Sequence, residues 1–292
     1  MRVFVTGASG WIGSAVVPEL IGAGHHVLGL ARSDASAATV TAAGAEVLRG
    51  DLADQDALRA GAAGADAVVH LAFVHDFSRF EASIRTDAQA IETLGAALEG
   101  SGKPLVIASG TPAVPGGTAT ERDGAAPGSP AAGREANARA ALAMAAHGVR
   151  SSVVRLPRTV HGEGDGGFVA RLVAIARDRG VAGYVGDGAG RWPAVHVGDA
   201  AHLFRLAVER APAGSVLHAV ADEGVPVREI AGVIGRHLHL PTASVPAEEF
   251  GFLGGILAVD QPASSTLTRE SFGWEPHRPG LLDDLEQGHY FA

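Results

Sequence analysis

The sequence predicts an α/β fold in which a doubly wound parallel sheet is covered by helices on both faces. Short apolar runs rich in Val, Ile and Leu alternate with Ala-rich helical stretches, which is typical of parallel strands buried on both faces. A glycine-rich turn directly follows the first apolar run, and after Pro157 the regular alternation gives way to glycine-rich sequence. We therefore expect a large α/β domain and a smaller C-terminal lobe.

The predicted elements follow the chain in order. Strands are expected near Val3–Thr6, Val27–Leu30, Glu46–Leu48, Ala67–Leu71, Leu105–Ala108 and Ser152–Leu156, with helices at Ile12–Ala23, Asp54–Gly61, Ser83–Glu99 and Arg134–His147. Right-handed crossovers between these strands generate the open sheet. A helix near Asp199–Arg210 and a strand near Val216–Val220 return to the sheet, and Val225–Leu238 is a further helix. Prolines after Leu240 are typical of a small irregular lobe.

Composition excludes several classes of partner and chemistry. Hydrophobic residues make up 47% of the chain, yet no apolar run approaches the roughly 20 residues of a membrane helix. The formal charge of −9 and the lack of a long basic run argue against a nucleic-acid partner. The absence of cysteine excludes disulfides, thiolate zinc sites and cysteine nucleophiles, and the paired histidines lack a carboxylate cluster, so no metal site is expected.

The expected partner is a small molecule, and a homodimer is left open as the oligomeric state. The chain begins with Met1 and enters a strand and its turn directly, which leaves no room for a secretory or transit peptide. We therefore expect a cytoplasmic protein.

The turn after the first strand reads Thr6-Gly7-Ala8-Ser9-Gly10-Trp11-Ile12-Gly13, with glycines three residues apart. Gly7 suits a tight turn, Gly10 allows a pyrophosphate to approach the backbone, and Gly13 allows close helix-to-strand packing. The N-terminus of the following helix offers free N–H groups and a positive dipole end to phosphates. The turn predicts a Rossmann-type dinucleotide site in which Thr6, Gly7, Ser9, Gly10, Trp11, Ile12 and Gly13 contact the cofactor.

This glycine spacing, preceded by threonine, resembles the extended short-chain dehydrogenase/reductase superfamily, specifically its epimerase/dehydratase-like group. Gly50-Asp51-Leu52 resembles the family's adenine-side acidic segment, and His70-Leu71-Ala72 resembles its backbone-contact segment after the fourth strand. Ser109 stands where the family's catalytic serine ends the fifth strand, and Val195–Asp199 resembles its late, mainly structural His-x-x-Asp segment. The resemblance covers essentially the whole chain and implies cofactor contacts at Asp51, Leu52, Leu71 and Ala72.

The end of the second predicted strand indicates NADP(H) rather than NAD(H). An NAD-binding member carries a carboxylate there, which accepts hydrogen bonds from the ribose hydroxyls. Here Ala31 is followed by Arg32 and Ser33, a guanidinium and a hydroxyl that suit the 2′-phosphate of NADP. The alternative is that Arg32 is an ordinary surface arginine and that Asp34 serves the ribose.

The family's usual acid pair, Tyr-x-x-x-Lys, is absent. The only tyrosines are Tyr184 and Tyr290, neither is followed by lysine four residues on, and Lys103 is the sole lysine. In the expected region the tyrosine position is Pro130 or Ala131, and the lysine position is Arg134 or Glu135. Arg134 is expected to touch the nicotinamide ribose in place of the lysine, but arginine holds its proton too firmly to relay it.

Three interpretations remain open. Ser109 polarises a carbonyl substrate while Tyr184, His161 or His75 donates the proton; the substrate is an imine that arrives protonated; or the protein binds NADP without turnover as a sensor. We expect an NADP-dependent reductase of a small, fairly apolar carbonyl or imine compound. The rival enzyme is an NAD-dependent sugar epimerase or dehydratase, which would hold a substrate diphosphate with arginines such as Arg158, Arg171 or Arg191.

The predicted elements divide the chain into two regions. Residues 1–157, completed by about 195–222, form the predicted NADP-binding domain. Residues 158–194 and 223–292 form the predicted substrate-binding lobe.

Overall fold

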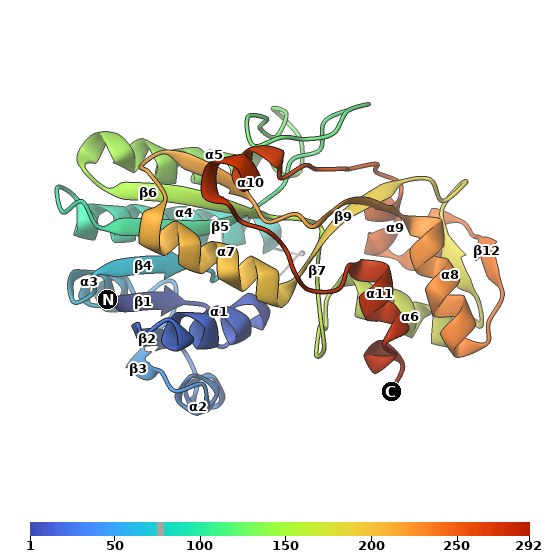
Figure 1. Ribbon diagram of the computed structural model, residues 1–292, viewed down its shortest axis with the longest axis horizontal. Coiled ribbons are helices and arrows are strands. Elements are labelled where there is room, and N and C mark those ends of the chain that lie inside the picture. Colours follow the sequence, from blue (N-terminus) through green and yellow to red (C-terminus); the bar gives the residue numbers. More distant parts are fainter. Residues whose placement is uncertain (75–78) are drawn as a thin grey trace. The chain divides into compact units, whose positions relative to one another are not determined.

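A computed structural model describes residues 1–74 and 79–292, which divide into two units. The first comprises Met1–Gly110, Pro127–Arg155 and Ala200–Leu217, and the second comprises Thr111–Ala126, Leu156–Asp199 and His218–Ala292. Their elements are labelled in Figure 1. Residues 111–126, which we expected in the dinucleotide-binding domain, belong to the second unit because Ala119 forms a β-bridge with Ala263.

A seven-stranded sheet organises the first unit. Its strands are β1 (Arg2–Thr6), β2 (His26–Ala31), β3 (Glu46–Arg49), β4 (Ala67–His70), β5 (Pro104–Gly110), β6 (Arg150–Leu156) and β10 (Ser215–His218), in the order β10-β6-β5-β4-β1-β2-β3. The pairs β1–β2, β2–β3, β1–β4 and β4–β5 are parallel. The chain therefore reverses its direction of winding between β1 and β4, where ligands of open α/β sheets bind. The predicted doubly wound α/β fold is confirmed.

Helices cover both faces of this sheet. They are α1 (Trp11–Gly22), α2 (Asp34–Ala42), α3 (Gln55–Ala63), α4 (Phe80–Leu98), α5 (Ala132–Ala143) with the 3₁₀ turn η2 (Met144–His147), and α7 (Val197–Arg210). In Figure 1, α1 and α7 lie in front of the sheet and α3 and α4 behind it. The sequence analysis missed α2, which begins with a capping box between Ser33 and Ser36.

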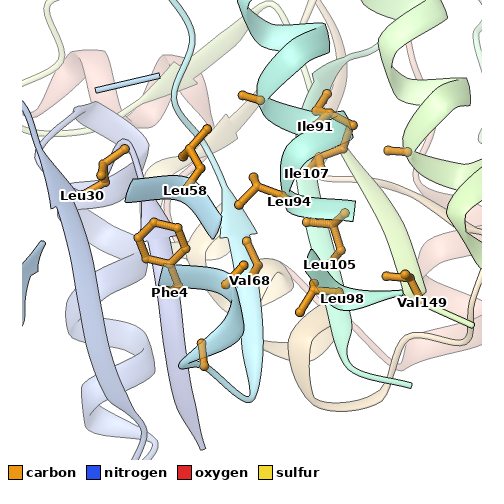
Figure 2. Close-up of a cluster of buried hydrophobic side chains, with 14 of the residues drawn as sticks. Phe4, Leu30, Leu58, Val68, Ile91, Leu94, Leu98, Leu105, Ile107 and Val149 are labelled. Atoms are coloured by element: carbon orange, nitrogen blue, oxygen red, sulfur yellow. The ribbon is translucent and has the colours of Figure 1, made fainter. Parts of the chain in front are cut away.

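The main apolar core of the first unit lies between the sheet and α3, α4 and α5. In Figure 2, Leu94 and Leu98 of α4 lie beside Leu105 of β5, while Leu58 of α3 lies near Phe4 of β1. All five side chains are fully buried. Their burial fixes the strands, and thereby the positions of the loops at the carboxyl edge of the sheet.

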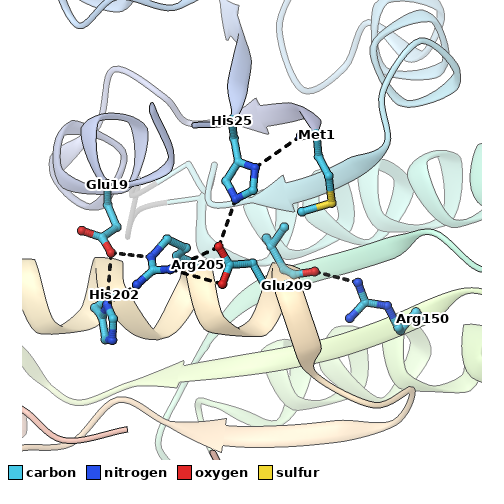
Figure 3. A network of polar contacts seen from close by, with 8 residues as sticks. Met1, Glu19, His25, Arg150, His202, Arg205 and Glu209 are labelled. Atoms are coloured by element: carbon cyan, nitrogen blue, oxygen red, sulfur yellow. Dashed lines mark hydrogen bonds and ion pairs between the residues drawn. The ribbon is translucent and has the colours of Figure 1, made fainter. Parts of the chain in front are cut away.

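Polar contacts join α7 to α1 on the opposite face (Figure 3). Glu19 of α1 accepts a hydrogen bond from Arg205 Nε at 2.7 Å and lies 3.0 Å from Nδ1 of His202. Arg205 also pairs with Glu209, whose carboxylate lies 3.1 Å from Nε2 of His25. The predicted helix near Asp199–Arg210 is therefore tied to the first helix of the sheet.

The second unit contains more regular structure than the sequence suggested. Its strands are β7 (Thr159–His161), β8 (Ala182–Tyr184), β9 (Arg191–His196), β11 (Asp222–Pro226) and β12 (Thr242–Ser244), arranged as the sheets β11-β9-β7 and β12-β8. Its helices are α6 (Phe168–Arg179), α8 (Val227–Leu238), α9 (Phe252–Leu257), α10 (Thr266–Phe272) and α11 (Leu281–Glu286), with 3₁₀ turns η3 (Ala247–Phe250) and η4 (His289–Phe291). Of these helices only α8 was predicted. Helices α9, α10 and α11 are short, whereas α6 is as long as α8 and was missed because the glycine-rich sequence around it was taken as loops.

None of the helices in the described part of the chain combines the length and apolar character needed to cross a bilayer.

Arg205→Gln tests the contact between α1 and α7. The substitution leaves a partly buried Glu19 carboxylate without its cation, so we expect the free energy of unfolding at pH 7 to fall by roughly 1 kcal/mol. Arg85→Gln, which removes an exposed pair with Glu81 at 3.9 Å, is the matched control and should cost less than about 0.5 kcal/mol. Urea unfolding followed by circular dichroism measures both, and equal stability of wild type and Arg205→Gln at pH 7 would contradict the prediction.

The same contact predicts a pH dependence. Burial raises the pKa of Glu19, but hydrogen bonds from Arg205 and His202 outweigh it, so the pKa lies below the ordinary 4.5. Because the folded state has the lower pKa, this stabilisation is fully present above pH 4.5 and is lost as the pH falls through the folded-state pKa. The stability difference between wild type and Arg205→Gln should therefore shrink on acidification.

Candidate active site

The glycine turn has the geometry that its spacing predicts. Gly7 has φ +71°, and a Cβ there would lie 2.7 Å from the backbone nitrogen of Ala72, in the chain leaving β4. A Cβ at Gly13 would overlap the Gly7 carbonyl oxygen, so α1 packs on the turn only because Gly13 lacks a side chain. A Cβ at Gly10 would meet only the Gly7 carbonyl oxygen, at 3.3 Å. The turn therefore leaves space above Gly10.

The N-terminus of α1 faces this space. Gly10 is the N-cap residue, and no side chain of the described residues caps the helix. An uncapped first turn presents backbone N–H groups and the positive end of the helix dipole. This arrangement suits an anionic group such as a pyrophosphate, while cofactor contacts at Thr6, Ser9, Trp11 and Ile12 stay predictions.

The end of β2 presents one free cation. Arg32 follows β2 directly, is exposed, and has no hydrogen bond or ion pair to the described residues. Asp34 is paired with Arg49 of β3 at 2.8 Å, and Arg49 also donates to the Ser33 carbonyl oxygen at 2.7 Å. The Ser33 hydroxyl accepts from the Ser36 amide at 3.2 Å and caps α2. Of these groups, Arg32 is the one available to an anion.

The loops after β3 and β4 border the same edge of the sheet. Asp51 accepts hydrogen bonds from the Ala53 and Asp54 amides at 2.8 and 3.1 Å through Oδ1, which orders the loop after β3. Leu52 is half-buried against the main core. Leu71 donates its amide to the Thr6 carbonyl oxygen at 3.2 Å. These residues lie at the carboxyl ends of their strands, where the resemblance places cofactor contacts.

A buried polar network starts beneath the glycine turn. Thr6, at the end of β1, has no exposed surface, and its Oγ1 lies 2.8 Å from Nδ1 of His70 at the end of β4. The same oxygen accepts a hydrogen bond from the Ala72 amide at 3.3 Å. On the other side of the imidazole, His70 Nε2 lies 3.2 Å from Oδ1 of Asp87 in α4. Thr6 and Asp87 thus hold the ring from both nitrogens.

Asp87 connects this network to α5. Its Oδ2 accepts from Asn137 Nδ2 at 2.7 Å and pairs with Arg134 NH1 at 3.3 Å. Burial raises the pKa of Asp87, but the hydrogen bond with His70, the Arg134 charge and the Asn137 amide outweigh it, so the pKa lies below its ordinary value. The buried carboxylate is therefore ionised and fully surrounded by donors.

Arg134 lies at the end of β5, next to Ser109. Its NH2 donates to the Ala108 carbonyl oxygen at 2.9 Å, and its guanidinium carbon lies 4.0 Å from the centre of the Phe73 ring. Burial lowers the pKa of Arg134, and the charge of Asp87 offsets part of this effect. Ser109 is 7% exposed and is the second-last residue of the same strand. Of the predicted catalytic and nicotinamide-side residues, Ser109 and Arg134 both belong to the first unit, and Arg134 contacts the residue that precedes Ser109.

Two of the predicted proton donors, His161 and Tyr184, belong to the second unit. His161 is fully buried in the second unit, where its Nδ1 lies 2.9 Å from Oδ2 of Asp284 and its ring contacts His196. Tyr184 is half-buried against the core of the same unit. His75 lies outside the described residues. Proton donation by any of the three stays a prediction.

Two of the three arginines considered for a substrate diphosphate are bound within the second unit. Arg158 donates to the carbonyl oxygens of Ile256 and Val259 at 2.7 and 3.2 Å, and burial lowers its pKa to about 10. Arg191 forms a bidentate pair with Asp260, with contacts of 3.0 and 2.8 Å. Arg171 lies over the Phe252 ring, 5.2 Å from its centre.

Sequence reasoning missed His70 as a side chain, Asp87 and Asn137. Their signals were present. A polar residue ends β4 as Thr6 ends β1 and Ser109 ends β5, and Asn137 follows Arg134 by three residues on one face of α5. Asp87 interrupts the apolar face of α4.

The chain matches one family model and is similar to two relatives by sequence and to one solved structure. The model of the NAD dependent epimerase/dehydratase family matches residues 3–219. An uncharacterized protein of Schizosaccharomyces pombe is 46% identical over 295 residues, with 100% of each chain covered. A 4-hydroxy-2-methyl-3-oxo-4-farnesyl-3,4-dihydroquinoline-1-oxide ketoreductase of Stigmatella aurantiaca is 30% identical over 78% of this chain and 70% of its own length. The solved structure of MoeE5 in complex with UDP-glucose and NAD is 26% identical, with a TM-score of 0.80 and coverage of 99% and 97%.

Substitutions at two glycines separate folding from binding. In Gly13→Val the new side chain would overlap the Gly7 carbonyl oxygen, so we expect a loss of several kcal/mol in unfolding free energy or no folded protein. Gly10→Val faces mostly open space and should fold with near-normal stability, yet block a dinucleotide pyrophosphate. Thermal unfolding and calorimetric titration with NADPH measure the two effects, and near-normal NADPH affinity in Gly10→Val would place the site elsewhere.

Proposed function

The chain belongs to the NAD dependent epimerase/dehydratase family, and from this premise we propose that it is an NADP-dependent reductase of a small, fairly apolar carbonyl or imine compound. The observation that carries the proposal is the free guanidinium of Arg32 at the end of β2, beside a carboxylate that is already paired. When bound, the cofactor supplies the hydride. The residues of this chain supply the binding, orientation and electrostatics of the site.

The cofactor choice rests on charge. NAD selection uses a free carboxylate that accepts hydrogen bonds from the ribose. Asp34 is the carboxylate nearest in sequence to that position, but its pair with Arg49 occupies it. Arg32 has the fork of N–H donors that suits a 2′-phosphate. The uncapped N-terminus of α1 and the open space at Gly10 suit the pyrophosphate of either dinucleotide.

Two observations support a small carbonyl or imine substrate. The likeness to a ketoreductase of Stigmatella aurantiaca favours carbonyl reduction. MoeE5 binds UDP-glucose, but in this chain Arg158 is bound to backbone carbonyl groups and Arg191 to Asp260. A nucleotide-sugar diphosphate held by Arg158 or Arg191 would have to displace these internal partners. Of the three candidates only Arg171, which lies over the Phe252 ring, has no such partner among the described residues. This disfavours the epimerase alternative.

A second candidate function is an NADP(H) sensor without turnover. The absence of the Tyr-x-x-x-Lys pair favours it, because a general acid typically contributes ~10²–10⁴-fold in rate. The sensor and the reductase share the cofactor site and differ only in turnover.

Arg32→Ala tests the cofactor preference. We expect calorimetric titration of the wild type to give tighter binding of NADP(H) than of NAD(H), and the variant to lose most of this difference, about tenfold or more in Kd. Affinity for NADH should change little, because it lacks the 2′-phosphate. Arg59→Ala, an exposed arginine of α3 paired with Asp56, is the matched control. Equal affinity of the wild type for the two cofactors would refute the preference.

Ser109→Ala tests the reaction. NADPH consumption is measured on panels of aldehydes, ketones and cyclic imines. Carbonyl reduction should lose at least about tenfold in kcat, because the serine hydroxyl stabilises charge that develops on the oxygen. Imine reduction should lose less, since a protonated imine develops no alkoxide. Unchanged carbonyl turnover would remove Ser109 from the mechanism, and no turnover on any panel despite tight NADPH binding would favour the sensor.

A further inference from the structure

The structure settles which residue of α5 faces the end of β5. Arg134 and Glu135 were both candidates for the position of the family's lysine. Glu135 is buried against Arg155 of β6, with a contact of 3.1 Å. Arg134 instead donates to the Ala108 carbonyl oxygen, one residue before Ser109. Pro130 and Ala131, the candidates for the tyrosine position, are exposed and carry no proton to donate. The site therefore has a permanent cation and no acid at these two positions.

The Arg134 guanidinium is fixed by three different contacts. Its NH2 donates to the Ala108 carbonyl oxygen, its NH1 pairs with the Asp87 carboxylate, and the Phe73 ring covers one face of the guanidinium. Arginine has five N–H donors, and the others have no hydrogen-bond partner among the described residues. The side chain retains 20% of its exposure. The remaining donors are thus available to a group at the carboxyl edge of the sheet.

Asp87 is itself held in place, which is why it positions Arg134. Its side chain is 4% exposed, and His70 and Asn137 contact the two carboxylate oxygens. His70 is in turn anchored to Thr6 beneath the glycine turn. The chain Thr6–His70–Asp87–Arg134 therefore links the turn at the end of β1 to the cation at the end of β5.

We propose that Arg134, rather than contacting the nicotinamide ribose as expected from the resemblance, is the electrophile that replaces the missing tyrosine–lysine pair. Asp87 is the positioning residue that fixes it. The inference rests on the proposed carbonyl reduction. Hydride addition to the carbonyl carbon breaks the C=O π bond and moves its electron pair to the oxygen. The guanidinium and the Ser109 hydroxyl stabilise the resulting alkoxide by charge-assisted hydrogen bonds. The alkoxide then takes a proton from a water molecule, which leaves as hydroxide.

This assignment has a consequence for pH dependence. A tyrosine acid loses activity when it ionises, whereas a guanidinium stays charged throughout the accessible range. In Arg134→Lys the cation becomes an amine with an ordinary pKa of about 10. Burial lowers this pKa and the charge of Asp87 offsets part of that effect, so the amine loses its proton at the alkaline end of the measured range. The variant should therefore acquire an alkaline decline in kcat that the wild type lacks.

The experiment compares wild type, Arg134→Lys, Arg134→Met, Asp87→Asn and the double variant Asp87→Asn/Arg134→Met. Arg139→Met, an exposed arginine of the same helix, is the matched control. Carbonyl kcat is measured from pH 6 to 10.5, NADPH Kd by fluorescence titration, and the stability of the cofactor-free protein by urea unfolding.

We expect Arg134→Met to lower kcat about 100-fold, while its Kd for NADPH changes less than about threefold. Arg134→Lys should retain activity at neutral pH and lose it as the pH rises. Asp87→Asn should lower kcat about tenfold in the wild type and not at all in the Arg134→Met background. In the cofactor-free protein the double variant should be more stable than Arg134→Met, which leaves Asp87 buried without its cation.

Four results would overturn the inference. For Arg134→Met they are a kcat within twofold of wild type or a tenfold loss of NADPH affinity. For Arg134→Lys it is a pH profile of kcat that matches wild type. For the double variant it is additivity of the kcat effects of Asp87→Asn and Arg134→Met. A wild type that reduces neither carbonyls nor imines removes the proposed function and the inference together. Reduction of imines alone, or carbonyl turnover that ignores Arg134, removes the inference and leaves the proposed function. If Arg134→Met fails to fold, the pH profile of Arg134→Lys decides.

Discussion

The close approach between the turn after β1 and the chain leaving β4 is the constraint on which the rest of this structure depends. The Gly7 backbone lies so near the Ala72 amide that no side chain fits between them. Below this contact, the Thr6 hydroxyl joins the Ala72 amide and the His70 ring. The ends of two adjacent parallel strands are thereby locked together where the sheet reverses its winding. The uncapped start of α1 is held over that point, and a phosphate-binding surface exists because the backbone there carries no side chains.

The buried pair of Asp87 and Arg134 is tolerated in the interior because both side chains have several partners. A buried carboxylate or guanidinium alone costs several kcal/mol, and even a pair often does no better than apolar side chains of similar volume. Here the Asp87 carboxylate has three donors, and the Arg134 guanidinium has a carbonyl oxygen, a carboxylate and an aromatic face. Stability alone does not require such an arrangement. Holding a cation at one position at the end of β5 does require these contacts, because a lone arginine with four rotatable bonds would not stay in one position.

Sequence patterns predicted the first unit well because its signals are local. Alternating apolar runs locate its seven strands, and the Gly7–Gly13 spacing locates the turn. Helix α2 was missed because its short, polar sequence has little apolar periodicity, and its start depends on the Ser33–Ser36 capping box. In the second unit the strands were missed, partly because strands of three residues such as β7 and β8 leave no periodic signal. Asp87 and Arg134 are far apart in sequence, and their pairing depends on how α4 and α5 pack against each other.

The arginines of this chain illustrate how one fold supports different chemistry. A guanidinium is always charged, so its role is decided by what already occupies it rather than by its pKa. Arg191 is paired with Asp260, and Arg49 with Asp34 and a backbone carbonyl oxygen. Arg32 has no partner among the described residues, and Arg134 is held but only partly used. Counting arginines in the sequence would make a nucleotide-sugar enzyme plausible. Their internal partners instead distinguish a free cation at the end of β2 from a fixed cation at the end of β5. A 2′-phosphate and a developing alkoxide are the two anions that a dinucleotide-dependent carbonyl reduction would bring to those positions.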